Sequence, residues 1–184
     1  AAPPAAAGTS AKAMYLSLNR GATPRGAGLR PAPARGFLER QLESARALPA
    51  DLPARPGLLD GWSQRHVMDV GSAYQQYLAG RKSGAPRLYF QNKAAALYFL
   101  RAVAPTKLVD GAWLYGLLPR WRDTAFHGLI RTYLEELGDG VDDKNHVAIY
   151  QALLAAHGCT QWENLADEHF VQGAIQLALA AEAD

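Results

Sequence analysis

The sequence predicts an all-α protein, and three observations support this class. From Asp60 onward, apolar residues recur at the three- and four-residue spacing of amphipathic helices. The helical runs are separated by Pro, Gly or capping residues, which are the usual start and stop signals of helices. No run shows period-two alternation bounded by turn signals, so no strand competes with this interpretation.

The first 56 residues differ in composition from the rest of the chain. They contain eight of the eleven prolines, and eight Lys/Arg against three acidic residues, although the whole chain carries a net charge of only +2. This composition is typical of an extended, partly disordered arm, and it includes one short helical candidate, Phe37–Leu48. We therefore expect an arm over residues 1–56 and a helical domain over residues 57–184. The arm lacks aromatic residues between its scattered charges, so we expect it to lie solvated across the body rather than to bind nucleic acid.

Five helices are predicted in the remainder. Pro86 can open the second, and Pro105 and Pro119 follow the ends of the second and third. Asp123 can cap the start of the fourth, and Gly138 suits the left-handed position after its end. The predicted ranges are Asp60–Gly80, Leu88–Ala104, Thr106–Leu118, Thr124–Leu137 and a helix that begins after Asp142 or Asp143 and ends at His157. A sixth helix is expected to begin at the capping box Thr160–Glu163 and to continue to about Ala183.

Several classes of protein are excluded or disfavoured by composition. The longest apolar run, Ala94–Ala104, is interrupted by Arg101, so no membrane span is predicted. With a single cysteine, Cys159, neither an internal disulfide nor a cysteine-based zinc site is possible, and the side chain is expected to pack as a small hydrophobe. No secretory signal is visible, and we expect a cytoplasmic protein that is not membrane-bound.

The segment from Tyr133 to His146 carries the clearest chemical signal. A carboxylate ends one predicted helix, a Gly-containing loop follows, and a histidine opens the next helix, so an αα-hairpin would bring Glu136 and His146 together. At about 100° per residue, Glu135 falls opposite the apolar face of its helix and Glu136 falls on its flank. His146 is expected near the middle of the buried face of its own helix, where the helix dipole favours the neutral imidazole that binds metals. The alternative is a structural histidine that hydrogen-bonds a carbonyl or Glu136 itself.

Asp110 is the other acidic residue of interest, because it falls within the apolar predicted helix Thr106–Leu118. An unpaired charge is costly there, so we expect pairing with Lys107 or Arg122, or service as an additional metal ligand. The remaining histidines show no partner pattern, and His157 is expected to act as a helix C-terminal cap. No catalytic side chain and no organic cofactor are predicted.

These residues resemble those of the iron-containing redox enzymes, the heme-oxygenase-like diiron oxidase family. Three segments from about Lys93 onward carry the resemblance: Ala102–Leu114, Tyr133–Gly140 with Asn145-His146, and Phe170–Ala178. The resemblance implies a heme-oxygenase-like helical bundle that binds non-heme iron, two ions in the complete protein, and uses dioxygen as co-substrate to oxidise a small molecule. It also implies that Glu136 and His146 are iron ligands, with Asp110 as the counterpart of an additional acidic ligand.

The chain departs from the family pattern in one respect. Family members complete the site with a further helical carboxylate and a His-x-x-x-Asp-x-x-His helix, and no such spacing occurs here. We therefore expect an N-terminal portion of a bundle, inactive by itself, whose partner is the remainder of its own chain or a second subunit. The competing hypothesis is a non-catalytic helical interaction module in which Glu136–His146 is a structural hydrogen bond.

Overall fold

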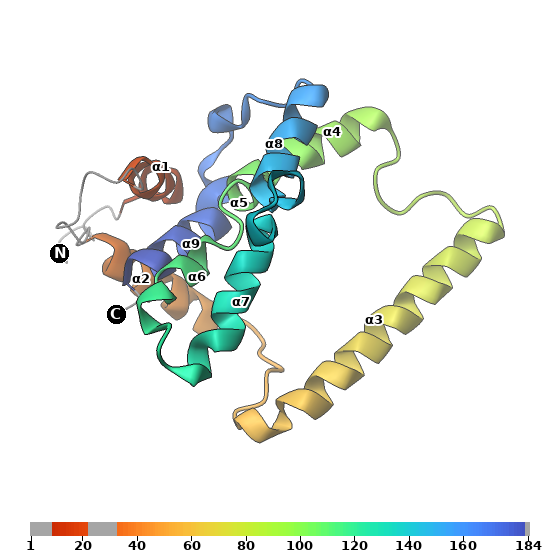
Figure 1. The fold of residues 1–184 in the computed structure, drawn as a ribbon. Helices are drawn as coiled ribbons and strands as arrows, with labels where there is room; N and C mark the ends of the chain where they lie inside the picture. Colours follow the sequence, from red (N-terminus) through yellow and green to blue (C-terminus); the bar gives the residue numbers. More distant parts are fainter. Residues whose placement is uncertain (1–8, 22–32, 183–184) are drawn as a thin grey trace, which may run out of the picture. The chain divides into compact units, whose positions relative to one another are not determined.

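The computed structural model describes residues 9–21 and 33–182, and within these ranges every regular element is helical (Figure 1). The α-helices are α1 Ala11–Gly21, α2 Pro33–Arg46, α3 Leu59–Lys82, α4 Lys93–Ala102, α5 Ala104–Lys107, α6 Ala112–Tyr115, α7 His127–Glu136, α8 His146–Ala156 and α9 Val171–Glu182. Short 3₁₀ helices connect them: η1 Pro56–Leu58, η2 Leu118–Arg120, η3 Thr124–Phe126, η4 Gly138–Gly140, η5 Asp142–Lys144, η6 Trp162–Asn164 and η7 Asp167–Phe170. The predicted all-α class is confirmed for this part of the chain. None of its helices is long and apolar enough to cross a membrane.

The chain divides into two compact units, one formed by Ala1–Ala45 with Leu97–Asp184 and the other by Arg46–Ala96. The second unit consists mainly of α3, whose extent agrees with the predicted helix Asp60–Gly80. Within it, the His66 Nε2 atom lies 2.8 Å from the Asp51 carboxylate and the His66 ring contacts the Trp62 ring. The predicted domain boundary at residue 56 stays a prediction, and the two compact units divide the chain at other positions, after residues 45 and 96.

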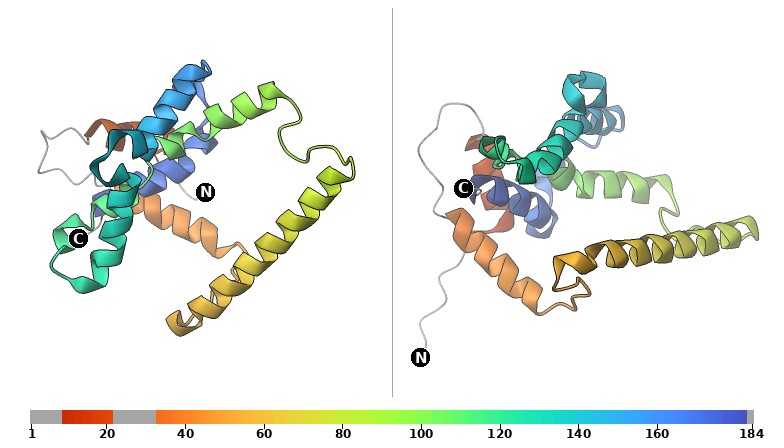
Figure 2. Two further views of the ribbon diagram at one scale, coloured as in Figure 1. Left: turned by 45° about the vertical axis from the view of Figure 1, so that its right-hand side comes forward. Right: turned by 60° about the horizontal axis from the view of Figure 1, so that its bottom comes forward.

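The core of the first unit lies where α1 packs against α9 (Figures 1 and 2). Met14, Tyr15, Phe37 and Phe170 are fully buried at its centre. Gly173 on α9 allows the close approach, because a Cβ atom there would lie 2.5 Å from the Pro105 carbonyl oxygen and 2.8 Å from the Tyr15 ring. Small residues at this crossing let large aromatic side chains fill the space between the helices.

The N-terminal segment therefore differs from the expected solvated arm. It contains α1 in addition to α2, which corresponds to the predicted helix Phe37–Leu48. Ala11, Met14 and Tyr15 follow the i, i+3, i+4 spacing of one helical face and are buried against α9. Burial of this face outweighs the high proline and charge content of the surrounding segment. The part of the predicted arm that falls on residues 1–8 and 22–32 lies outside the described residues.

Two predicted helices are broken in the structure. Thr106–Leu118 is interrupted at Gly111, whose φ of +77° is incompatible with a right-handed helix, so that α5, a turn and α6 replace one continuous helix. The capping box at Thr160 does not start α9, since Leu165 and Ala166 are extended and two short 3₁₀ helices precede Val171. Burial of Leu165 and Phe170 in the core accounts for this irregular path.

Helix caps elsewhere follow local sequence. Asp123 caps η3 by accepting a hydrogen bond from the Ala125 amide at 3.0 Å, as predicted. Asn145, rather than Asp142 or Asp143, caps α8 by accepting from the Ala148 amide at 3.0 Å. Because η5 holds the two aspartates one turn earlier, Asn145 is the polar residue that immediately precedes the helix.

The start of α1 is capped by a residue from the other end of the chain. The Asp167 carboxylate accepts hydrogen bonds from the Ala11 and Lys12 amides at 3.2 and 2.9 Å. Burial alone raises the pKa of Asp167, but these hydrogen bonds, one from the Ser10 hydroxyl and the Lys12 charge together leave the pKa below its ordinary value. Asp167 thus joins α1 to the segment that leads into α9.

We expect Asp167→Ala to reduce the free energy of unfolding at neutral pH by about 1 kcal/mol, as loss of a helix N-cap does. Since the folded-state pKa is lowered, the contribution of Asp167 is present above the unfolded pKa of about 3.9 and disappears as pH falls below it. Asp167→Asn is the matched control, because it keeps an acceptor but does not titrate. Urea unfolding at pH 7 and pH 3 tests this prediction. It is contradicted if the difference in free energy of unfolding between the unmodified protein and Asp167→Ala is the same at both pH values.

Candidate metal centre

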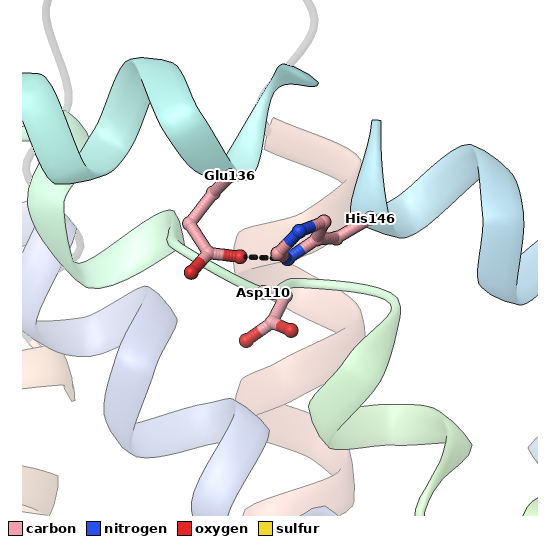
Figure 3. Close-up of side chains that lie close together, drawn as sticks. All are labelled: Asp110, Glu136 and His146. Atoms are coloured by element: carbon pink, nitrogen blue, oxygen red, sulfur yellow. Dashed lines mark ion pairs between the residues drawn. The ribbon is translucent and has the colours of Figure 1, made fainter. Parts of the chain in front are cut away.

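The structure brings together the three residues predicted to bind metal. Asp110 lies in the turn between α5 and α6, Glu136 is the last residue of α7, and His146 is the first residue of α8. One ligand atom from each lies within 4.8 Å of the ligand atoms of the other two. Figure 3 shows the Glu136 carboxylate directed at the His146 ring, with the Asp110 carboxylate beside the pair. Among the described residues, this is the group of three whose donors converge in this way.

The contact between Glu136 and His146 is short. The His146 Nδ1 atom lies 2.5 Å from Glu136 Oε2, which satisfies the distance of an ion pair. However, the contact lacks hydrogen-bond geometry, and Oε2 is buried without any hydrogen-bond partner. A buried carboxylate oxygen without such a partner is costly, because its desolvation is not compensated. Imidazole nitrogen and carboxylate oxygen are both atoms that bind cations, and a bound cation would compensate this oxygen.

Asp110 is held by a neighbouring lysine. The Lys107 ammonium donates to Asp110 Oδ2 at 2.8 Å, from three residues earlier in the chain. Of the two predicted partners, Lys107 is therefore confirmed, whereas the Arg122 guanidinium lies over the Trp121 ring. A carboxylate has two oxygens and several lone pairs, so this interaction leaves Asp110 able to accept a further contact.

The site is open on the side of His146. The His146 side chain is 51% exposed, whereas that of Glu136 is 24% exposed. The prediction that His146 lies in the middle of a buried helix face is therefore wrong. As the first residue of α8, it projects from the open end of the helix rather than from a packed turn. This exposure provides access from solvent.

The loop between α7 and α8 fixes the separation of Glu136 and His146. Gly138 has a φ of +74°, and a Cβ atom there would lie 2.6 Å from the backbone of both Lys144 and Asn145. Asp139 follows with a positive φ of 51°, a conformation that Asp tolerates better than most residues. The predicted αα-hairpin is not formed, because α8 continues beyond the end of α7 instead of folding back along it (Figures 1 and 3). Glu136 and His146 meet because the compact loop joins the last residue of α7 to the first residue of α8, and Gly138 lets the two ends of this loop touch.

The two adjacent glutamates have different environments, as helical phase predicted. Glu135 is more than half exposed and pairs with Arg131 one turn earlier at 3.0 Å. Glu136 points toward Asp110 and His146 instead. Surface pairs of this kind contribute little to stability, so Glu135 is a suitable reference for changes at Glu136.

The other histidines and the cysteine lie outside this group. The ring of His127 contacts the Trp121 carbonyl at 2.8 Å, His169 lies 3.5 Å from the Tyr98 hydroxyl, and His157 follows the end of α8. Cys159 is buried, as expected for a small packed side chain. Sequence reasoning did not identify Gly111 as part of the site, although the dipeptide Asp110-Gly111 is a recognised turn signal.

Comparison with known families gives one match, over the C-terminal part of the chain. Residues 97–182 match the sequence model of the family described as iron-containing redox enzyme. This segment is similar to that family. It includes Asp110, Glu136 and His146, and residues 1–96 lie outside the match. The all-α, heme-oxygenase-like class is therefore confirmed, and a redox function involving iron is supported at the level of the family. No match was found among curated proteins or among solved structures.

Proposed function

We propose that this protein contributes Asp110, Glu136 and His146 to a non-heme iron site which, together with ligands from the rest of its bundle, uses dioxygen to oxidise a small molecule. The convergence of three donor atoms from three separate segments carries the proposal. The family match supports iron and redox chemistry, while the choice of non-heme iron rests on these side chains.

The donor set fits an iron ion chemically. Imidazole nitrogen and carboxylate oxygen are the ligands of non-heme Fe(II) sites that keep open coordination positions. Two carboxylates also offset the charge of a divalent cation, and a cation would compensate the Glu136 oxygen that has no hydrogen-bond partner. When bound, iron supplies the one-electron chemistry that lets dioxygen react with an organic substrate.

The protein's own residues would position the reacting groups. His146 binds a metal only as the neutral imidazole, and its Nδ1 atom is the one that faces Glu136. Lys107 restrains Asp110 through its ammonium group, as hydrogen-bonded neighbours of metal ligands commonly do. The exposed side of His146 is where a small-molecule substrate would approach.

The alternative is an interaction module in which Glu136–His146 serves only structure. That hypothesis predicts a hydrogen bond between the two side chains. The contact has the distance but not the geometry of one, and the carboxylate oxygen is otherwise without a hydrogen-bond partner. We therefore favour the metal site and treat the structural role as an outcome of the test.

An anaerobic Fe(II) titration with quantification of retained iron tests the proposal. We expect the protein to retain iron, and His146→Ala to weaken binding by more than the roughly 10- to 100-fold that loss of a supporting residue costs. Glu136→Ala should have a similar effect because it removes another direct ligand.

Glu135→Ala is the matched control, because it removes a neighbouring carboxylate that faces away from the site. Equal iron binding by Glu135→Ala and the unmodified protein is expected. If the unmodified protein retains no iron, or if Glu136→Ala and His146→Ala change only thermal stability, the structural alternative is correct.

A further inference from the structure

Gly111 lies where the segment that carries Asp110 meets the helix that carries Glu136. A Cβ atom at Gly111 would lie 3.0 Å from the Glu136 Cβ atom and 3.1 Å from its Cγ atom. Both distances are shorter than ordinary van der Waals contact between carbon atoms. We propose that Gly111 is a positioning residue of the metal centre, whose missing side chain lets the Asp110 turn approach Glu136. This inference rests on the proposed function.

The backbone at Gly111 requires glycine for a second reason. Its φ of +77° lies in the left-handed region, and it is the residue before the first turn of α6. The turn is closed on both sides, by the Ala112 amide to the Val109 carbonyl at 3.0 Å and by the Leu114 amide to the Gly111 carbonyl at 2.9 Å. These hydrogen bonds hold the backbone of the turn that carries Asp110 in one conformation.

A side chain at Gly111 would push on the Cβ and Cγ atoms of Glu136, which carry its carboxylate. The Glu136 Cβ atom belongs to α7 and cannot move without the helix, so a new methyl group must displace either α7 or the Cγ atom. The Tyr133 ring also lies 3.7 Å from the position of that methyl group, so it limits how far the Glu136 side chain can rotate away. Either displacement moves the Glu136 carboxylate relative to His146 and Asp110.

Gly158 provides a matched control within the same unit. Its φ of +65° also lies in the left-handed region, but no atom outside its chain neighbours lies within 4 Å of the position of its Cβ. Gly158 follows α8 and lies outside the loop that joins Glu136 to His146. Alanine therefore introduces comparable backbone strain at both sites and a steric contact with Glu136 at Gly111 alone.

Gly111→Ala and Gly158→Ala are compared by anaerobic Fe(II) titration and by thermal unfolding. We expect Gly111→Ala to bind iron about 10- to 100-fold more weakly than Gly158→Ala. We also expect the Co(II)-substituted proteins to differ in their visible absorption spectra, because displacement of one ligand alters the coordination geometry. Should Gly111→Ala fail to fold, Gly111→Asn and Gly158→Asn replace the pair, since Asn tolerates positive φ better than Ala.

The outcomes separate this inference from the proposed function. If Gly111→Ala and Gly158→Ala bind iron equally, Gly111 has no positioning role, while the metal site stands. If the unmodified protein binds no iron, the proposed function fails, and the imidazole NMR signals of His146 then decide the inference. A shift of those signals in Gly111→Ala but not in Gly158→Ala supports displacement of Glu136, and its absence overturns it.

Discussion

Replacing Gly138 with alanine is expected to lower the free energy of unfolding by about 2–5 kcal/mol and to abolish iron binding. Strain from a positive φ contributes about 1–2 kcal/mol, and overpacking about 1–3 kcal/mol. The added Cβ atom would meet two backbone atoms at 2.6 Å rather than a flexible side chain. The backbone of the α7–α8 loop must therefore move, and His146, which immediately follows Asn145, moves with it.

Gly158→Ala is the control for this variant. Gly158 also follows a helix with a positive φ of +65°, but a Cβ atom there would have open space. We expect Gly158→Ala to cost only the strain of about 1–2 kcal/mol and to leave iron binding unchanged. Urea unfolding and Fe(II) titration of both variants provide the measurement. If Gly138→Ala and Gly158→Ala lose similar amounts of stability, the α7–α8 loop accommodates the added Cβ atom without the expected clash, and this prediction is wrong.

The second large effect is expected at Tyr15, which tests whether α1 belongs to the core. Tyr15 is fully buried, with ring contacts to Trp162 at 6.0 Å and to Phe170 at 5.4 Å between centroids. Truncation of a buried aromatic side chain costs about 3–5 kcal/mol, so we expect Tyr15→Ala to lower the free energy of unfolding by that amount. If residues 1–56 were a solvated arm instead, the change would be within about 0.5 kcal/mol.

Tyr15→Phe separates packing from polarity. The Tyr15 hydroxyl is buried without a hydrogen-bond partner, so its removal is expected to be neutral or stabilising. Burial, with a smaller effect from Glu163, raises the pKa of Tyr15 well above its ordinary value of 10.0. The stability due to the protonated group is present below pH 10 and decreases above it, as the unfolded chain ionises. Denaturation at pH 8 and pH 11 should therefore show a smaller alkaline loss in Tyr15→Phe than in the unmodified protein.

Much of the fold followed from local sequence because the deciding interactions lie within a few residues. The phase of α7 distinguished Glu136 from Glu135, and the cap at Asp123 and the glycine after α7 located the ends of that segment. The pairing of Asp110 with Lys107 was also predictable, since residues three apart are neighbours on a helical turn.

Other predictions failed where contacts between distant segments override local preference. The apolar pattern of residues 106–118 favours one helix, but the positive φ of Gly111 interrupts it beside α7. The Pro-rich N-terminal region reads as an arm, yet α1 is buried against α9 and capped by Asp167, more than 150 positions later in the sequence. The exposure of His146 depends on α8 starting at that residue, which the Asn145 cap determines.

At the candidate metal centre, too, the sequence predicted the residue types, and contacts between segments determined how they are arranged. Helical phase separated Glu136 from Glu135, and the resemblance to the iron-containing redox enzymes made Asp110, Glu136 and His146 the candidate ligands. Their convergence depends on two backbone contacts that no periodicity encodes, one between Gly111 and the Glu136 side chain and one between Gly138 and the backbone before His146. Periodicity describes which face a residue occupies on its own helix, whereas only packing between segments determines how close two faces come.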